Sequence, residues 1–146
     1  MEANPKTRML ILDDEPIVCK RLKPAFEKLG YAVEVFVDST EAMARIREKD
    51  FDIVITDLKM KGIDGLQFVD AVKAKSPETE VIVITGFATM ETAKDSFKLG
   101  IFDFVAKPFK ISDIRVVVEK AEQKRKASGR PLLSDRAQQS ARGLDG

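Results

Sequence analysis

The sequence predicts an α/β fold, with five parallel strands in one sheet and helices on both of its faces. The first observation is that short apolar runs rich in β-branched or aromatic residues recur five times along the chain. The second is that a stretch with helical patterning follows each run. The third is the length of 146 residues, which suits one compact domain. The five runs are Met9–Leu12, Val33–Val37, Ile53–Thr56, Val81–Ile84 and Phe102–Val105.

The helices follow in order from apolar stripes and end signals. Apolar residues between Val18 and Leu29 form one face of a first helix, and Gly30 follows it as the expected C-terminal cap. Asp38, with Glu41 three residues later, has the pattern of a capping box at the start of a second helix. Later stripes predict three more helices, the last of them capped by Ser112. These stripes are Leu66, Val69 and Val72; Met90, Ala93 and Phe97; and Ile114, Val117, Val118 and Ala121.

Composition also predicts the order of the strands. The first, third and fourth runs are continuously apolar, as strands buried on both faces should be. The second and fifth runs contain Glu34 and Asp103, and a charged residue suits the edge of a sheet. With the second and fifth strands at the edges, the strand order is 2-1-3-4-5, that of a flavodoxin-like doubly wound sheet with right-handed crossovers. Ligands of such sheets bind beyond the carboxyl ends of the strands, here between the first and the third.

Composition excludes several kinds of site and partner. The chain has 25 basic and 24 acidic residues, and its net charge of +1 gives no case for direct binding of nucleic acid. Without histidine there is no His-based zinc site and no Ser-His-Asp triad. The single cysteine, Cys19, excludes an internal disulfide, and we expect it to face the core from the first helix. No apolar run is long enough to span a membrane, so we expect a cytoplasmic protein.

One domain is predicted to account for most of the chain. Residues 1–7 are expected to form an N-terminal extension and residues 8–122 the domain itself. Residues 123–146 are expected to form a charged helix end followed by a disordered tail, because apolar residues become scarce there. This tail is too short for a DNA-binding domain.

Polar side chains follow four of the predicted strands at their carboxyl ends. Asp13 and Asp14 follow the first strand, with Glu15 beside them, and Asp57 follows the third. Carboxylates about 4 Å apart repel by roughly 4 kcal/mol at an effective dielectric of about 20, so a cation is expected among them. Hard oxygen ligands in an open crevice suit Mg²⁺.

Thr85 and Lys107 follow the fourth and fifth strands and reach the same edge of the sheet. With Mg²⁺, a lysine and a hydroxyl could stabilise a transferring phosphoryl group. One carboxylate must then accept the group, and Asp57, alone at the centre of the crevice, is the best candidate. Taken singly, each residue has a plainer reading. The aspartates could cap a helix, Thr85 could bond to backbone, and Lys107 could be a solvated loop residue.

The chain resembles a receiver domain of two-component response regulators. Four motifs carry the resemblance, in order and over most of the chain, from about Arg8 to Ala121. They are "LILDDEP" at 10–16, "DIVITDLKMKGIDG" at 52–65, "VIVITGFA" at 81–88 and "FDFVAKPF" at 102–109. The stretch "ITGFATMETA" most resembles receivers of NtrC-like regulators.

The resemblance implies a role for each matching residue. Asp57 corresponds to the phosphoacceptor, Asp13 and Asp14 to the acidic pair that binds Mg²⁺, and the backbone carbonyl of Lys59 to a further metal ligand. Thr85 corresponds to the switch hydroxyl, and Lys107 corresponds to the lysine that pairs with the phosphoryl group. The peptide bond between Lys107 and Pro108 is expected to be cis, as in the family.

Phe104 corresponds to the switch aromatic. The side chains of Lys59, Lys61 and Phe87 stand at positions expected to modulate the lifetime of the acyl phosphate. At Lys61 many receivers have proline instead.

The implied function is a phosphorylation-activated switch. A sensor histidine kinase donates the phosphoryl group, and the domain catalyses its own phosphorylation and its slow dephosphorylation. The response is a conformational change on the face formed by the fourth helix, fifth strand and fifth helix. Among the three valines Val116–Val118 we expect one, Val116, to face outward there, toward a homodimer or effector partner.

An alternative remains a receiver-fold interaction module that works without phosphorylation. A phosphatase of the haloacid dehalogenase type would need an acid where Lys59 stands, and a nucleotide-binding enzyme would need a glycine-rich loop.

Overall fold

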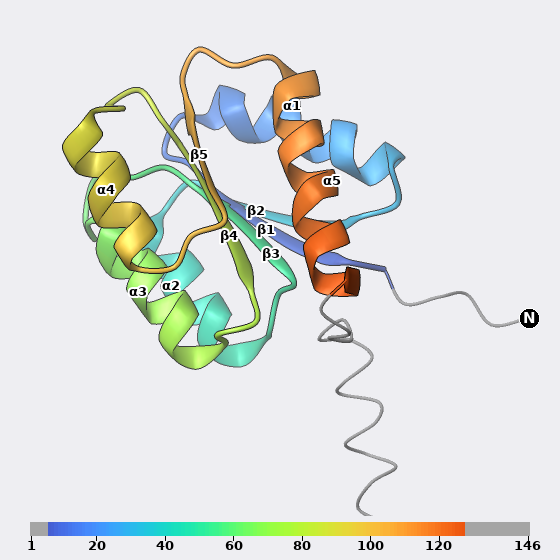
Figure 1. Cartoon of the computed structure of the whole chain (residues 1–146), viewed down its shortest axis with the longest axis horizontal. Coiled ribbons are helices and arrows are strands. Elements are labelled where there is room, and N and C mark those ends of the chain that lie inside the picture. The colour runs from blue at the N-terminus through green and yellow to red at the C-terminus, as the bar shows by residue number, and fades with distance from the viewer. Residues whose placement is uncertain (1–5, 128–146) are drawn as a thin grey trace, which may run out of the picture.

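The structure is a computed structural model of the chain, and it describes residues 6–127. Five strands and five helices alternate along this part of the chain (Figure 1). The strands are β1 (Arg8–Leu12), β2 (Ala32–Phe36), β3 (Ile53–Thr56), β4 (Glu80–Thr85) and β5 (Asp103–Ala106). The helices are α1 (Pro16–Lys28), α2 (Ser39–Glu48), α3 (Gly65–Lys75), α4 (Met90–Lys98) and α5 (Ile111–Ala127).

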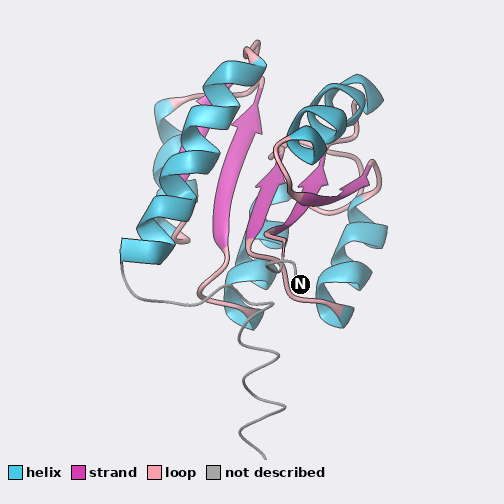
Figure 2. Ribbon diagram, turned by 90° about the vertical axis from the view of Figure 1, so that its right-hand side faces the viewer, coloured by secondary structure: helices cyan, strands magenta, loops and turns pink. Residues whose placement is uncertain are grey.

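The strands form one parallel sheet in the order β2-β1-β3-β4-β5, which confirms the predicted order. Figure 2 shows the strands running side by side with helices on both sides of the sheet. Because β1 and β3 are neighbours, with Leu12 level with Thr56, the residues that follow these strands emerge next to each other. The register of the sheet therefore brings Asp13 and Asp57 together.

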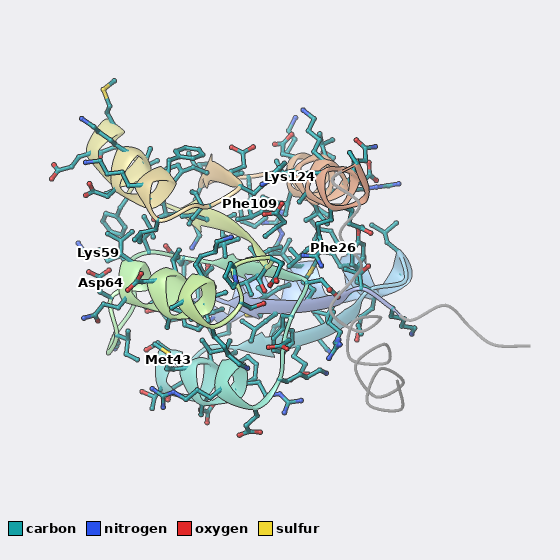
Figure 3. The ribbon with its side chains drawn as sticks, turned by 60° about the horizontal axis from the view of Figure 1, so that its bottom comes forward. Phe26, Met43, Lys59, Asp64, Phe109 and Lys124 are labelled. Carbon is teal, nitrogen blue, oxygen red and sulfur yellow. The ribbon has the colours of Figure 1, made fainter. Side chains whose placement is uncertain are left out.

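Two apolar layers hold the helices on the sheet. On one face, α1 and α5 cover strand residues such as Ile11 and Ile55, and Cys19 belongs to this layer. Phe26 lies inside the same layer (Figure 3). On the other face, α2 and α3 cover Leu10 and Val54. Alternate side chains of each inner strand enter opposite layers, which accounts for the continuously apolar runs. The buried position of Cys19 confirms the prediction for it.

The charged residue of β2 is held by α2 at the edge of the sheet. Glu34 accepts hydrogen bonds from Arg45, at 2.7 and 3.0 Å, and from Lys49, at 2.9 Å. The hydrogen bond from Arg45 is the main reason that the pKa of Glu34 is lowered to about 2. Glu34 thus suits the edge position and also fixes α2 against it.

Of the three predicted helix ends, Gly30 agrees with the structure, Asp38 caps its helix without the capping box that Glu41 would complete, and Ser112 is wrong. Gly30 adopts a φ of +98° just beyond the C-cap of α1, and the Asp38 side chain caps α2 by accepting the Thr40 N–H at 2.7 Å. Ser112, however, does not cap α5, because the helix already begins at Ile111. The N–H of Lys110 instead donates to the Asp113 carboxylate at 3.3 Å.

Helix α5 continues beyond the last predicted apolar residue, Ala121, and ends at Ala127. Within its charged end, Arg125 is only 1% exposed and lies 3.5 Å from the buried carboxylate of Asp52. The predicted domain limit at residue 122 falls inside this helix. Residues 128–146 of the predicted tail, and residues 1–5 of the predicted extension at residues 1–7, lie outside the described residues. Between residues 6 and 127, no helix is both long and apolar enough to cross a membrane.

Candidate functional site

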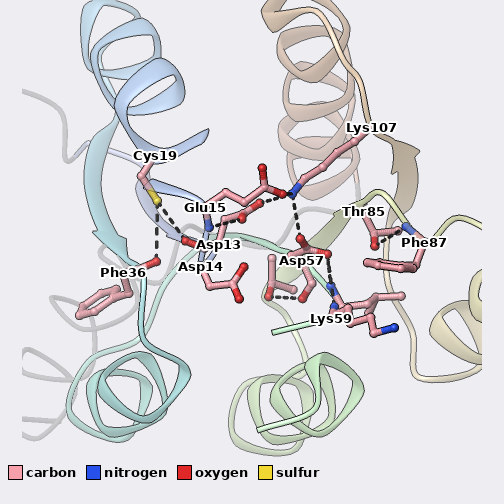
Figure 4. Close-up of polar contacts among 12 residues, drawn as sticks. Asp13, Asp14, Glu15, Cys19, Phe36, Asp57, Lys59, Thr85, Phe87 and Lys107 are labelled. Atoms are coloured by element: carbon pink, nitrogen blue, oxygen red, sulfur yellow. Dashed lines mark hydrogen bonds and ion pairs between the residues drawn. The ribbon is translucent and has the colours of Figure 1, made fainter. Parts of the chain in front are cut away.

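An acidic crevice lies at the carboxyl ends of the central strands, where the sequence predicts it (Figure 4). Asp13 and Asp14 come from the loop after β1, and Asp57 from the loop after β3. One carboxylate oxygen from each of the three lies within 4.8 Å of the others. Lys107, from the loop after β5, points into the same crevice. Four of the predicted site residues are therefore brought together.

Asp57 is only 4% exposed, and both of its carboxylate oxygens accept hydrogen bonds. Oδ1 accepts the N–H of Leu58 at 2.6 Å and that of Lys59 at 3.3 Å. Oδ2 accepts a hydrogen bond from Lys107 Nζ at 2.8 Å. A buried carboxylate is tolerable where hydrogen bonds and an opposite charge replace its water.

Lys107 is shared by three carboxylates. Its Nζ lies 2.8 Å from Asp13, 2.8 Å from Asp57 and 3.0 Å from Glu15. Burial alone would lower the pKa of Lys107, but the hydrogen bonds with these acids outweigh burial and raise it. Lys107 is therefore a fixed positive charge rather than a solvated loop lysine. The peptide bond that joins it to Pro108 is cis, as the resemblance implies.

Asp13 is the most enclosed acid of the crevice and is 0% exposed. Its Oδ1 accepts the Glu15 N–H at 2.9 Å, whereas Oδ2 faces the ammonium of Lys107 at 2.8 Å. Burial is the main cause of a raised pKa at Asp13. The contacts with Lys107 and Glu15 therefore do not fully offset the cost of burying the carboxylate form.

The helix-capping interpretation of the first acidic pair does not hold. The N-cap of α1 is Glu15, and no side chain caps this helix end. Asp14 instead lies across the crevice from the loop after β3, where it accepts the Lys61 N–H at 3.4 Å. Neither aspartate is therefore needed to begin the helix.

The three carboxylates fit a hard divalent cation. They supply only oxygen ligands, one oxygen from each lies within 4.8 Å of the others, and burial raises the pKa of Asp13, so a cation would relieve the cost of its charged form. Mg²⁺ favours such a set, with few protein oxygens and the remaining positions filled by water. Lys59, whose carbonyl is predicted as a further ligand, lies in the loop directly after Asp57.

Among residues 6–127, neither predicted switch residue, Thr85 nor Phe104, forms a hydrogen bond with the Asp57 carboxylate. Thr85 is buried, and its Oγ1 accepts the Phe87 N–H at 3.1 Å, so the plainer interpretation of a strand-end hydroxyl describes this structure. Phe104 is half-buried against the layer on the α2 and α3 side. The side chain of Lys59 lies over the Phe87 ring, 4.1 Å from Nζ to the ring centroid.

Lys61 contributes its backbone to the site. Besides the N–H that reaches Asp14, its carbonyl accepts a hydrogen bond from Ser39 Oγ at 3.2 Å. The Lys61 side chain is exposed and is not needed for these contacts. The absent proline therefore leaves an N–H that bonds to the acidic pair.

One residue of the site, Gly65, was missed from the sequence, and Glu15, which was expected beside the acidic pair, was given no partner there. Glu15 is the third partner of Lys107, and Gly65 allows α3 to begin against the loop that carries Asp57. A Cβ on Gly65 would lie 2.3 Å from Leu58 Cα and 2.6 Å from the Asp57 carbonyl oxygen. A glycine at the first residue of a helix is the signal that could have indicated such a close approach.

Comparison with known proteins gives the same picture as the geometry. A profile of the family described as "Response regulator receiver domain" matches residues 9–119. The chain is 31% identical over 134 residues to the transcriptional regulatory protein ZraR of Salmonella typhimurium, covering 92% of this chain and 30% of that protein. It is 33% identical over 115 residues to the nitrogen assimilation regulatory protein NtrX of Azorhizobium caulinodans, covering 77% of this chain and 25% of that protein.

The chain thus spans about a third or less of the length of these two relatives.

Solved structures agree with the fold. A CheY-like response regulator receiver domain protein from Methanospirillum hungatei superimposes with a TM-score of 0.79 at 26% identity, covering 84% of this chain and 99% of that one. A response regulator from Burkholderia pseudomallei with a phosphorylated aspartic acid and a calcium ion gives a TM-score of 0.73 at 26% identity, covering 86% of this chain and 76% of that one.

Proposed function

Because the chain belongs to the response regulator receiver domain family, we propose that it is a signalling switch operated by phosphorylation of Asp57. The observation that carries the proposal is the position of this carboxylate. It lies at the centre of the crevice, 2.8 Å from Lys107 and beside two further acids. A nucleophilic carboxylate next to a cation and a metal-binding pair is the arrangement that phosphoryl transfer requires.

In the proposed reaction, a phosphohistidine of a sensor histidine kinase donates its phosphoryl group. The bond from phosphorus to the imidazole nitrogen breaks as a bond to an Asp57 oxygen forms, and the imidazole keeps the electron pair. Lys107 pairs with a phosphoryl oxygen and offsets the charge on the phosphorus group. The backbone N–H groups of Leu58 and Lys59 hold the carboxylate in place during the attack.

Mg²⁺ is the proposed cofactor, held by Asp13, Asp14, Asp57 and the Lys59 carbonyl. When bound, it neutralises charge on the phosphoryl oxygens during transfer. Asp13 contributes a carboxylate whose repulsion by its neighbours is relieved by a cation. Asp14, the most exposed of the three aspartates, would complete this set of ligands on the solvent side.

The proposed response begins at Thr85. A phosphoryl group adds about −1.5 to −2 charges, and hydrogen bonding by the Thr85 hydroxyl to this group requires it to leave the Phe87 N–H. The neighbouring helix α4 can follow, because Ser96 is the only buried residue of that helix. Phe104, on β5, can then turn inward, and the face formed by α4, β5 and α5 changes shape.

This face is the proposed surface for a homodimer or effector partner. Val116 of α5 is 48% exposed, as expected from the valine triplet, and Phe97 of α4 is equally exposed. Slow hydrolysis of the acyl phosphate by the domain itself would end the signal. We place the protein in the cytoplasm with its kinase, and the match to NtrX agrees with an NtrC-like receiver.

The test is phosphorylation by acetyl phosphate with Mg²⁺, measured by intact-protein mass spectrometry. The wild type should gain one phosphoryl group and Asp57→Ala none, while chelation of Mg²⁺ should abolish labelling. Asp70→Ala is the matched control, because Asp70 is an exposed aspartate on α3, away from the crevice. Equal labelling of Asp57→Ala would refute the assignment. No labelling of the wild type would favour the alternative of an interaction module that works without phosphorylation.

A further inference from the structure

Two loops at the mouth of the crevice are joined by a contact between side chains. The Lys59 ammonium, from the loop after β3, lies 4.1 Å from the centroid of the Phe87 ring, from the loop after β4 (Figure 4). Phe87 is 52% exposed, and Lys59 is exposed as well. Within residues 6–127, the Lys59 ammonium forms no ion pair with an acidic side chain, although three carboxylates lie nearby. Its positive charge is therefore directed to an aromatic face.

The backbones of the same two residues hold the reactive side chains. The Lys59 N–H donates to Asp57 Oδ1 at 3.3 Å, and the Phe87 N–H donates to Thr85 Oγ1 at 3.1 Å. The side-chain contact thus connects the loop that holds the phosphoryl acceptor with the loop that holds the hydroxyl. While Lys59 rests on the ring, Phe87 is kept where its N–H can bond to Thr85.

We propose that the contact between Lys59 and Phe87 is a latch that keeps Thr85 in its unphosphorylated position. The phosphoryl charge on Asp57 releases it. The inference rests on the proposed function, and it deepens that function by assigning a regulatory role to two side chains. Lys59 and Phe87 act through Thr85 and are positioning residues.

The release follows from electrostatics. An ammonium is attracted to an aromatic ring by a quadrupole, which is weaker than its attraction to a full opposite charge nearby. A phosphoryl group on Asp57 places one to two added negative charges close to Lys59. The ammonium then leaves the ring for the phosphoryl oxygens, and the loop after β4 becomes free to move. Thr85 can exchange the Phe87 N–H for the phosphoryl group.

The expected size of the effect follows from the strength of an exposed cation–π contact. Such a contact shifts a two-state equilibrium about two- to fivefold. Removing the ring should therefore make the switched conformation easier to reach by about this factor. The Lys59→Met variant removes both the latch and the attraction of the Lys59 ammonium to the phosphoryl group. In this background the Phe87 ring should no longer affect the switched conformation.

The test is a double-mutant cycle with beryllofluoride, which stands in for the phosphoryl group on a carboxylate. The full chain with Mg²⁺ is titrated and followed by the amide resonances of Thr85 and Phe87 or its replacement. Phe87→Leu should bind beryllofluoride about two- to fivefold more tightly than the wild type, and it should have no further effect in the Lys59→Met background. Leu29→Ala is the control, because Leu29 is an exposed apolar residue at the C-cap of α1, at the end of that helix opposite the crevice.

A second readout needs no phosphoryl analogue. In the wild type the ring current of Phe87 should shift the ε-methylene protons of Lys59 upfield, and Phe87→Leu should abolish this shift. Beryllofluoride should abolish it as well. The latch would be overturned if the upfield shift persisted with beryllofluoride bound, or if Phe87→Leu had an equal effect in both backgrounds. Either result would leave the proposed phosphorylation of Asp57 standing. Failure of the wild type to bind beryllofluoride at all would overturn the proposed function and the release step with it.

Discussion

Replacing Asp13 with asparagine should stabilise the metal-free protein. Removing one partner of a buried ion pair usually lowers the free energy of unfolding by about 3–5 kcal/mol. For Asp13→Asn we expect the opposite, a gain in stability. The reason is that Asp13 is buried among acids as well as beside Lys107. Burial raises the pKa of Asp13, so its charged form is disfavoured in the folded state. Stability linked to this group is greatest below its unfolded pKa and declines as pH rises through the folded value.

The distances give the magnitude. Oxygens of Asp14 and Asp57 lie within 4.8 Å of Asp13, so each pair repels by about 3.5 kcal/mol or more at an effective dielectric of about 20. Lys107 attracts Asp13 across 2.8 Å, which is worth about 6 kcal/mol on the same scale. The two repulsions, about 7 kcal/mol together, slightly exceed the attraction. Asparagine also avoids most of the cost of burying a charge, so we expect a gain of about 1–2 kcal/mol at pH 7.

Urea denaturation followed by circular dichroism measures this change. In EDTA the midpoint for Asp13→Asn should rise without a change in slope. Saturating Mg²⁺ should stabilise the wild type, by about 2.7 kcal/mol at 100 times the dissociation constant, and the variant much less. The control Asp70→Asn should stay within about 0.5 kcal/mol of the wild type. A loss of 2 kcal/mol or more for Asp13→Asn in EDTA, on the scale expected for a broken buried pair, would refute the reasoning.

Three further predictions test other parts of the structure. Because the pKa of Glu34 is lowered to about 2, its ion pair with Arg45 stabilises the fold above pH 4.5 and is lost as pH falls toward 2. Glu34→Gln should therefore cost about 1–2 kcal/mol at pH 7, after allowance for solvent screening, and nothing near pH 2 in urea titrations. Gly65→Ala should cost about 1–3 kcal/mol and slow labelling by acetyl phosphate, because its Cβ would meet the Leu58 backbone at 2.3 Å; wild-type stability and labelling would contradict the close approach. Val116→Glu should leave unfolding unchanged within about 0.5 kcal/mol but weaken self-association of the beryllofluoride-bound protein in sedimentation. Identical sedimentation of variant and wild type would count against a homodimer through this face.

Local patterns along the chain were enough to predict the sheet and the centre of the site. A strand alternates its faces and a helix repeats every 3.6 residues, so the apolar positions identify both kinds of element. The charges in the second and fifth runs indicated the edges and thereby the strand order. Once β1 and β3 are neighbours, their carboxyl ends meet, and Asp13, Asp14 and Asp57 must converge. The acidic crevice follows from periodicity and the rules of parallel sheets.

Contacts between distant residues required the tertiary structure. Arg125 lies in a charged stretch that reads as a solvated helix end, yet it is buried because Asp52, 73 residues earlier, lies within reach. Glu15 reaches Lys107 across 92 positions, and Lys59 reaches the Phe87 ring instead of the nearby acids. A charged side chain has several candidate partners of similar energy, and no local pattern ranks them. The sequence by itself determined which groups meet at the crevice, whereas only the packing of the loops decided which partner each side chain takes.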